Sequence, residues 1–179
     1  IHRTGGRYYN FIPWAVWQLH CLRPDDAFLA EIAPSLARNV DAWVDLYDTD
    51  GDGLIEVTNH NKTGKEYQPS YWYFSDYPKD PHQGQAVLER VDATVYFILN
   101  ANAVADIFNA LGKPESDLYR ELAERSRAAL REFMWDPETR FFYDVRKEDN
   151  RMAMVRNVVG FDPYMDDALG EDYLDVFGE

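Results

Sequence analysis

The stretch LERVDATVYFILNANAVADIFNALGKPESDLYRELAERSRAALREFMW, residues 88–135, decides the fold class. Its first half, residues 88–111, is apolar around much of the helical circumference, which predicts an inner, buried helix. Gly112 supplies a helix stop and Pro114 the next helix start. Residues 115–135 place charged side chains opposite an apolar stripe, which predicts an outer helix. Together the two segments predict a helical hairpin.

A second pair of helices is predicted upstream of this hairpin. Residues 12–22 form a short apolar segment, and Pro13 suits its first helical turn. Residues 26–47 repeat apolar side chains at the three-and-four spacing of an amphipathic helix. Pro34 lies inside this segment and predicts a kink or a division into two shorter helices.

Two further segments show no helical period. Residues 48–87 form a long segment without clear periodicity, and loops of this length are more often functional than decorative. Residues 141–145 predict a short strand, with a partner within residues 152–159. Two helical hairpins separated by a long loop indicate a helical toroid or solenoid. An irregular helical bundle is the alternative, and periodicity alone does not choose between them.

Composition excludes several classes of protein. The 179 residues suffice for a single domain and its core, so residues 1–179 are expected to form one unit. Lysine and arginine number 18 against 32 acidic residues, a net charge of −14 that disfavours nucleic-acid and membrane-surface partners. No apolar run approaches the ~20 residues of a membrane span. A single cysteine, Cys21, excludes an internal disulfide framework. The compartment is left unconstrained.

An acidic turn follows the second helix. Asp48, Asp50 and Asp52, followed by Gly53, match the first half of a calcium-binding EF-hand loop. The twelfth position is Asn59, where that loop requires a bidentate glutamate. A tight turn whose carboxylates cap backbone N–H groups is therefore the favoured interpretation, and no cofactor is expected. Calcium is kept as the weaker alternative.

The long loop also joins one carboxylate to a dense group of aromatic side chains. Glu66 lies beside Tyr67, Tyr71, Trp72, Tyr73, Phe74 and Tyr77. Sugars present C–H faces that stack on such rings and hydroxyl groups that bind carboxylates and amides. Burial among rings favours the protonated carboxyl group that a general acid needs. The alternative is a loop that packs its aromatic side chains as a satellite core, with Glu66 paired to Lys62 or Lys65.

Several motifs resemble those of a known superfamily. Residues 5–17, the Asp52-Gly53-Leu54 turn, the Thr63-Gly64-Lys65-Glu66 stretch and Val91-Asp92 occur in the order seen in the six-hairpin (α/α)6 glycoside hydrolases. The chain is most similar to the processing α-glucosidases, trehalases and bacterial mannosylglycerate hydrolase-like enzymes. The resemblance implies an all-α toroid of helical hairpins, here incomplete, with a long central loop and a short β-hairpin.

The resemblance also implies the reaction. Glu66 occupies the position of the general acid, although those families carry an aspartate there. Their catalytic base is a glutamate on a late helix, which is expected to lie beyond residue 179. The implied reaction is hydrolysis of an α-glucosidic or α-mannosidic bond with inversion, by two carboxyl groups about 6.5–9.5 Å apart. The implied partners are an oligosaccharide or small glycoside, and the remainder of the toroid or a second chain that supplies the base.

Six further residues are candidates for binding the substrate. Trp14, Tyr67 and Trp72 could stack on sugar rings, Gln68 could bind a hydroxyl group, and Arg90 and Asp92 could grip further hydroxyl groups. Trp14 could equally be core packing. For an isolated Arg90–Asp92 pair, a helix cap with a salt bridge is the simpler interpretation.

Two other functions stay open beside hydrolysis. A non-catalytic carbohydrate-binding or assembly module of the same fold would explain the missing base. A calcium-binding helical protein would explain only the acidic turn. If the chain is half of a toroid, the apolar faces of residues 12–22 and 88–111 should be exposed or covered by a partner.

Overall fold

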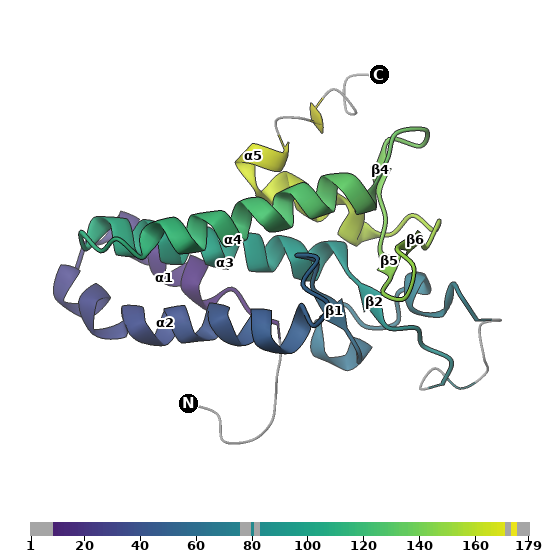
Figure 1. Cartoon of the computed structure of the whole chain (residues 1–179), viewed down its shortest axis with the longest axis horizontal. Coiled ribbons are helices and arrows are strands. Elements are labelled where there is room, and N and C mark those ends of the chain that lie inside the picture. The colour runs from purple at the N-terminus through teal and green to yellow at the C-terminus, as the bar shows by residue number, and fades with distance from the viewer. Residues whose placement is uncertain (1–8, 76–79, 81–82, 171–172, 175–179) are drawn as a thin grey trace.

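A computed structural model describes residues 9–75, 80, 83–170 and 173–174 (Figure 1). Four long helices dominate it: α1 (Ile12–Leu22), α2 (Asp26–Tyr47), α3 (Val91–Ala110) and α4 (Ser116–Ala129). The last of these continues into a π-helical turn, η3 (Leu130–Met134). Shorter helical segments are η1 (His60–Lys62), η2 (Pro69–Trp72), η4 (Val158–Met165) and α5 (Asp167–Gly170).

Helix α3 is the core of the molecule. It packs against α1, α2, α4 and η4, and most of its side chains are buried. This confirms the inner helix expected from the apolar sequence. Among the described residues, α3 is also the one helix long and apolar enough to cross a membrane, but 89% of the qualifying window is buried inside the fold. Its apolar character is therefore explained by core packing.

Helix α4 is the outer member of the predicted hairpin. Gly112 adopts a φ of +65° after α3, the left-handed conformation that glycine favours at a helix end. Tyr119 and Ala123 of α4 are buried, whereas Glu121 and Arg120 point to solvent. The outer helix expected from residues 115–135 is thus confirmed, with its last turn in the π form.

Helix α2 is one continuous helix, so the division into two shorter helices predicted from Pro34 is wrong. Asp25 caps its N-terminus by accepting a hydrogen bond from the N–H of Phe28 (3.0 Å). Its apolar face packs on α3 on both sides of the proline, through Leu29, Ala33, Leu36, Val40 and Trp43. This burial offsets the hydrogen bond that proline removes.

The described residues are mostly helical, as expected, but their short strands form more than the single predicted β-hairpin. Four antiparallel strands lie in the order β1 (Glu56–Val57), β2 (Leu88–Glu89), β5 (Val145–Arg146) and β6 (Arg151–Met152). In a separate pair, β3 (Trp135–Asp136) lies antiparallel to β4 (Phe141–Phe142). The strand predicted at residues 141–145 is therefore divided between two sheets. Its C-terminal end pairs with β6, close to the predicted partner.

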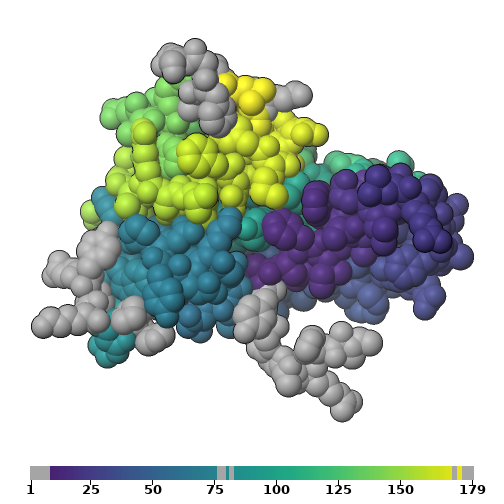
Figure 2. All heavy atoms as spheres, turned by 180° about the vertical axis from the view of Figure 1, so that it is seen from behind, coloured from purple at the N-terminus to yellow at the C-terminus, as the bar shows by residue number. Residues whose placement is uncertain are grey.

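The sheet determines where the long loop lies. Strand β1 leaves the acidic turn, and β2 runs directly into α3, so the loop between them starts and ends at the N-terminus of the core helix. The loop contains η1 and η2 and no long helix among its described residues, as expected. In the view of Figure 2, the loop lies below the C-terminal segment and to the left of α1.

Candidate active site

Glu66 lies in a turn between η1 and η2 and is half-buried. No hydrogen bond or ion pair joins its carboxylate to another residue in the described part of the chain. Both of its neighbours are anchored, Lys65 by an ion pair and Tyr67 by ring contacts. The turn therefore presents a carboxylate that is held in place through the backbone and still has free acceptor positions.

Tyr67 adopts a φ of +59°, in the left-handed region that non-glycine residues rarely occupy. Its ring lies edge-on to His60, with centroids 5.0 Å apart, and parallel to Trp72 at 6.4 Å. Its side chain is 59% exposed. Backbone strain of this kind is concentrated at functional sites, where the surrounding structure holds it. Here it places an exposed aromatic face directly beside Glu66.

Gln68 and Trp72 complete the predicted loop motif. The side-chain oxygen Oε1 of Gln68 is buried, and no described residue donates a hydrogen bond to it. Trp72 is almost fully buried, and its Nε1 donates to the carbonyl oxygen of Gln83 (3.1 Å). The amide oxygen is therefore a buried acceptor without a described donor, whereas the indole N–H is already used within the protein.

Lys65 links the loop to the C-terminal segment. Its ammonium group forms an ion pair with Asp162 of η4, lies 4.0 Å from Asp92 Oδ2, and sits 5.2 Å from the ring centroid of Tyr96. Burial acts to lower the pKa of Lys65, but the hydrogen bond to Asp162 raises it overall. For the Asp162 carboxyl group burial has the opposite effect and raises the pKa. This contact fixes the residue that directly precedes Glu66.

Arg90 and Asp92 form a fully buried ion pair. The guanidinium group donates two hydrogen bonds to the Asp92 carboxylate, both 2.9 Å long, and stacks 4.6 Å from the ring of Tyr71. Its Nη1 lies 3.6 Å from Asp144 Oδ2. Burial acts to lower the pKa of Arg90, and the charges of Asp144 and Asp92 outweigh it and raise the pKa. The pair is a buried salt bridge in which the Arg90 side chain does not cap the helix, so direct contact with a sugar would require it to open.

Asp144 connects this pair to the long loop. Ser70 of η2 donates to Asp144 Oδ2 (2.6 Å), and the N–H of Val91 donates to Oδ1 (3.0 Å). Burial raises the pKa of Asp144, although the charge of Arg90 opposes this. One buried carboxylate therefore ties the loop that carries Glu66 to the first turn of α3.

The structure divides the predicted site residues into three groups. Glu66, Tyr67, Gln68 and Trp72 lie together on one loop. Arg90 and Asp92 lie at the start of α3. Asp92 is close to Lys65 of the loop, and Arg90 is linked to the loop by Asp144. Trp14 is half-buried on α1 and lines a different hollow of about 290 Å³, together with residues of α3, α4 and η4.

Three participants were not singled out from the sequence as site residues: Lys65, Asp144 and Asp162. Asp162 is 97 residues away from Lys65 along the chain, and Asp144 is 74 residues away from Ser70. The available signal was that Asp144 and Asp162 each follow aromatic residues in otherwise apolar segments. That signal indicates burial of a charge but gives no partner for it.

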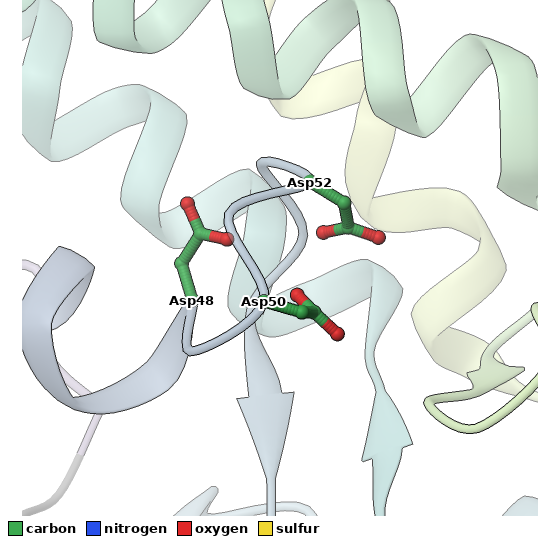
Figure 3. A group of neighbouring side chains, drawn as sticks. All are labelled: Asp48, Asp50 and Asp52. Atoms are coloured by element: carbon green, nitrogen blue, oxygen red, sulfur yellow. The ribbon is translucent and has the colours of Figure 1, made fainter.

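The acidic turn brings its three aspartates together. One carboxylate oxygen from each of Asp48, Asp50 and Asp52 lies within 4.8 Å of the others. Figure 3 shows Asp50 and Asp52 projecting from the same side of the turn, above β1 and β2. Among the described residues, these are the side chains grouped closely enough to hold a metal ion.

The fold and the site define a domain of helical hairpins that carries a carboxylate loop over the N-terminal end of its core helix. A sequence model of the mannosylglycerate hydrolase MGH1-like glycoside hydrolase domain matches residues 2–177. The chain belongs to this family, which confirms the resemblance drawn from its motifs.

Solved structures show the same fold at low sequence identity. The GH63 mannosylglycerate hydrolase from Thermus thermophilus in complex with glucose matches with a TM-score of 0.77 and 15% identity, over 92% of this chain and 49% of that one. Its complex with Tris and D-glycerate matches with a TM-score of 0.70 and 14% identity, over 87% and 49%. A sialidase matches with a TM-score of 0.70 and 15% identity, over 89% of this chain and 13% of its own. The chain spans about half the length of the mannosylglycerate hydrolase chains.

Proposed function

We propose that this chain forms the acid-bearing half of an inverting glycoside hydrolase that cleaves an α-glucosidic or α-mannosidic bond. Glu66 is the general acid that protonates the glycosidic oxygen. The base lies outside residues 1–179, on the remainder of an (α/α)6 toroid or on a second chain. Family membership supports the reaction class, and the half-length match supports the division of the site.

The observation that carries the assignment is the turn at Glu66. Lys65 is bound to Asp162, and Tyr67 is held against His60 and Trp72, so the residue between them is fixed on both sides. Its carboxyl group is half-buried and makes no hydrogen bond to another described residue. A general acid requires this combination of a fixed position and a free proton-bearing oxygen.

The neighbouring side chains fit a sugar. The exposed ring of Tyr67 offers a stacking face. Oε1 of Gln68 is buried and receives no hydrogen bond from a described residue, so it would accept from a sugar hydroxyl group only after the loop opens. Arg90, Asp92 and Asp144 act from below by holding the loop on α3. An inverting site needs its base about 6.5–9.5 Å from Glu66, with room for a water molecule. The matched hydrolase was solved with glucose and with D-glycerate, which supports a small α-glycoside as substrate.

The test compares two substrates in the whole protein that contains this chain. Glu66→Gln should lower hydrolysis of an alkyl α-glycoside by about 10²–10⁴-fold, because the leaving oxygen is no longer protonated. The same variant should retain most of its turnover of the matching α-glycosyl fluoride, whose leaving group needs little protonation. Glu31→Gln, an exposed change of the same type on α2, is the matched control.

Two results would count against the proposal. Near-normal turnover of the alkyl glycoside by Glu66→Gln would remove Glu66 as the acid. Sugar binding without hydrolysis of either substrate by the unaltered protein would favour the non-catalytic module. Measuring the first-formed anomer by NMR tests inversion separately.

A further inference from the structure

Lys65 directly precedes the proposed acid, Glu66, and its charge is already paired within the protein. Its ammonium group forms an ion pair with Asp162 of η4 and lies 4.0 Å from Oδ2 of Asp92. It also sits 5.2 Å from the ring centroid of Tyr96. The side chain of Lys65 keeps 25% of its surface exposed. The cation nearest to the acid is therefore accessible to solvent but held by carboxylates.

The second cation of this cluster, Arg90, is also occupied. It has no exposed surface and donates to both oxygens of Asp92 at 2.9 Å. Its Nη1 lies 3.6 Å from Oδ2 of Asp144. Asp144 is held in turn by the hydroxyl group of Ser70 and the N–H of Val91. Arg90 is therefore closed to a ligand, and both oxygens of Asp92 are already in use.

Carboxylates outnumber cations around the acid loop. The cluster holds two cations against three buried carboxylates, those of Asp92, Asp144 and Asp162. The half-buried carboxyl group of Glu66 lies beside it in the chain. The whole chain carries a net charge of −14, which adds a field that disfavours anions. Neither cation of this cluster is thus left for an anionic ligand.

The role proposed for Glu66 places these charges beside the leaving group. A general acid donates its proton to the glycosidic oxygen, the atom that joins the sugar to its aglycone. The residue next to Glu66 is therefore close to the aglycone. A free ammonium group at that place would bind a carboxylate by a charge-assisted hydrogen bond. Because Lys65 is bound to Asp162, an aglycone carboxylate would instead face an excess of negative charge.

We propose that Asp162 is a specificity-determining residue that holds Lys65 and thereby selects an uncharged, hydroxyl-bearing aglycone over one that carries a carboxylate. The inference rests on the proposed hydrolysis by Glu66 and names the substrate class of the same site. The exposed ring of Tyr67 agrees with it, since it offers a stacking face without charge. Lys62 of η1 is the other lysine in the described part of the loop and forms no ion pair with a described residue, so its role is tested separately.

The experiment compares two substrates in the whole protein that contains this chain. An α-glycosyl glycerol and an α-glycosyl glycerate carry the same sugar, and their aglycones differ only in a hydroxymethyl group and a carboxylate. Near neutral pH, the unaltered protein should hydrolyse the glycerol substrate with a kcat/KM at least tenfold higher. The ratio of the two values within one protein does not depend on the fraction that is folded, so it separates specificity from stability.

Asp162→Asn tests the assigned residue. It leaves Lys65 without its bound carboxylate, so the ratio should fall at least tenfold, mainly through a lower KM for the glycerate. Adding Lys65→Gln to Asp162→Asn should restore the ratio of the unaltered protein, because the released cation is then gone. Asp117→Asn, an exposed change of the same type on α4, is the matched control and should leave the ratio unchanged.

Equal use of both substrates by the unaltered protein would overturn the inference, while hydrolysis by Glu66 would stand. An unchanged ratio in Asp162→Asn would overturn it as well. A preference for the glycerate that Lys62→Gln removes would have the same meaning, because the anion would then bind a cation of the same loop. Absence of turnover of every substrate by the unaltered protein, the α-glycosyl fluoride included, would reject the proposed function and this inference with it.

Discussion

Arg90 shows how much a single buried side chain holds together. Its guanidinium group is bound by Asp92, approached by Asp144 and covered by the ring of Tyr71, with no exposed surface. Arg90→Met would keep the volume but leave two buried carboxylates without their cation. We expect the free energy of unfolding in urea to fall by about 3–5 kcal/mol.

Arg120→Met is the control for this prediction. Arg120 also pairs with an aspartate, Asp106, but both side chains are substantially exposed. Loss of that pair should cost less than about 1 kcal/mol. Equal losses of unfolding free energy in the two variants would show that the buried contacts of Arg90 stabilise the fold no more than the exposed pair of Arg120 does.

Residues close in sequence were the predictable part of the site. Glu66, Tyr67, Gln68 and Trp72 form one short stretch, so the sequence alone places them on the same loop. The pairing of Lys65 with Asp162 depends on how η4 packs, and no local pattern encodes it. The sequence also did not show whether Arg90 and Asp92 are buried. A structural ion pair at a helix start and a pair that binds substrate have the same residues in sequence.

At the scale of elements, η4 is positioned by a close backbone contact. A Cβ added to Gly160 would lie 2.3 Å from the ring of Phe141 and 2.6 Å from the carbonyl oxygen of Phe142. The backbone oxygen of β4 cannot rotate away, so Gly160→Ala should push η4 off the strand. We expect a loss of about 1–3 kcal/mol in the free energy of unfolding, measured by urea denaturation.

Gly112→Ala separates steric contact from backbone conformation. Gly112 has a φ of +65° with no atom within 4 Å of an added Cβ, so its replacement brings only left-handed strain of about 1 kcal/mol.

The Gly160 variant should also loosen the ion pair between Asp162 and Lys65, since Gly160 and Asp162 lie on the same segment, η4, and move together. A Gly160→Ala protein as stable as the parent would show that η4 is not fixed by this contact.

Helices were predictable as elements, whereas of the strands the sequence indicated only those near residues 141–152. The apolar period of residues 88–135 gave the α3–α4 hairpin because a long repeat averages out local exceptions. Strands of two residues carry no period, and β1 and β2 are paired only through tertiary structure. Pro34 predicted a break that the structure does not have, because packing of α2 on α3 outweighed the local preference of proline.

At the scale of the whole molecule, α1 and the start of α2 expose an apolar surface. Its members are Ile12, Leu19, Leu22 and Phe28, which are 55%, 55%, 85% and 45% exposed. By contrast, the side chains of α3 are mostly buried, so the exposure expected for a half toroid is found on α1 and not on the core helix. Exposed apolar groups of this kind mark surfaces that another polypeptide covers.

We expect this surface to mediate association of the isolated chain. The double change Leu19→Ser and Leu22→Ser should weaken self-association at least tenfold in sedimentation velocity. It should change the free energy of unfolding of the monomer by no more than about 0.5 kcal/mol, because both side chains are more than half exposed. Leu118→Ser on α4, 52% exposed and outside this surface, should leave association unchanged. A parent chain that stays monomeric at high concentration would contradict the prediction.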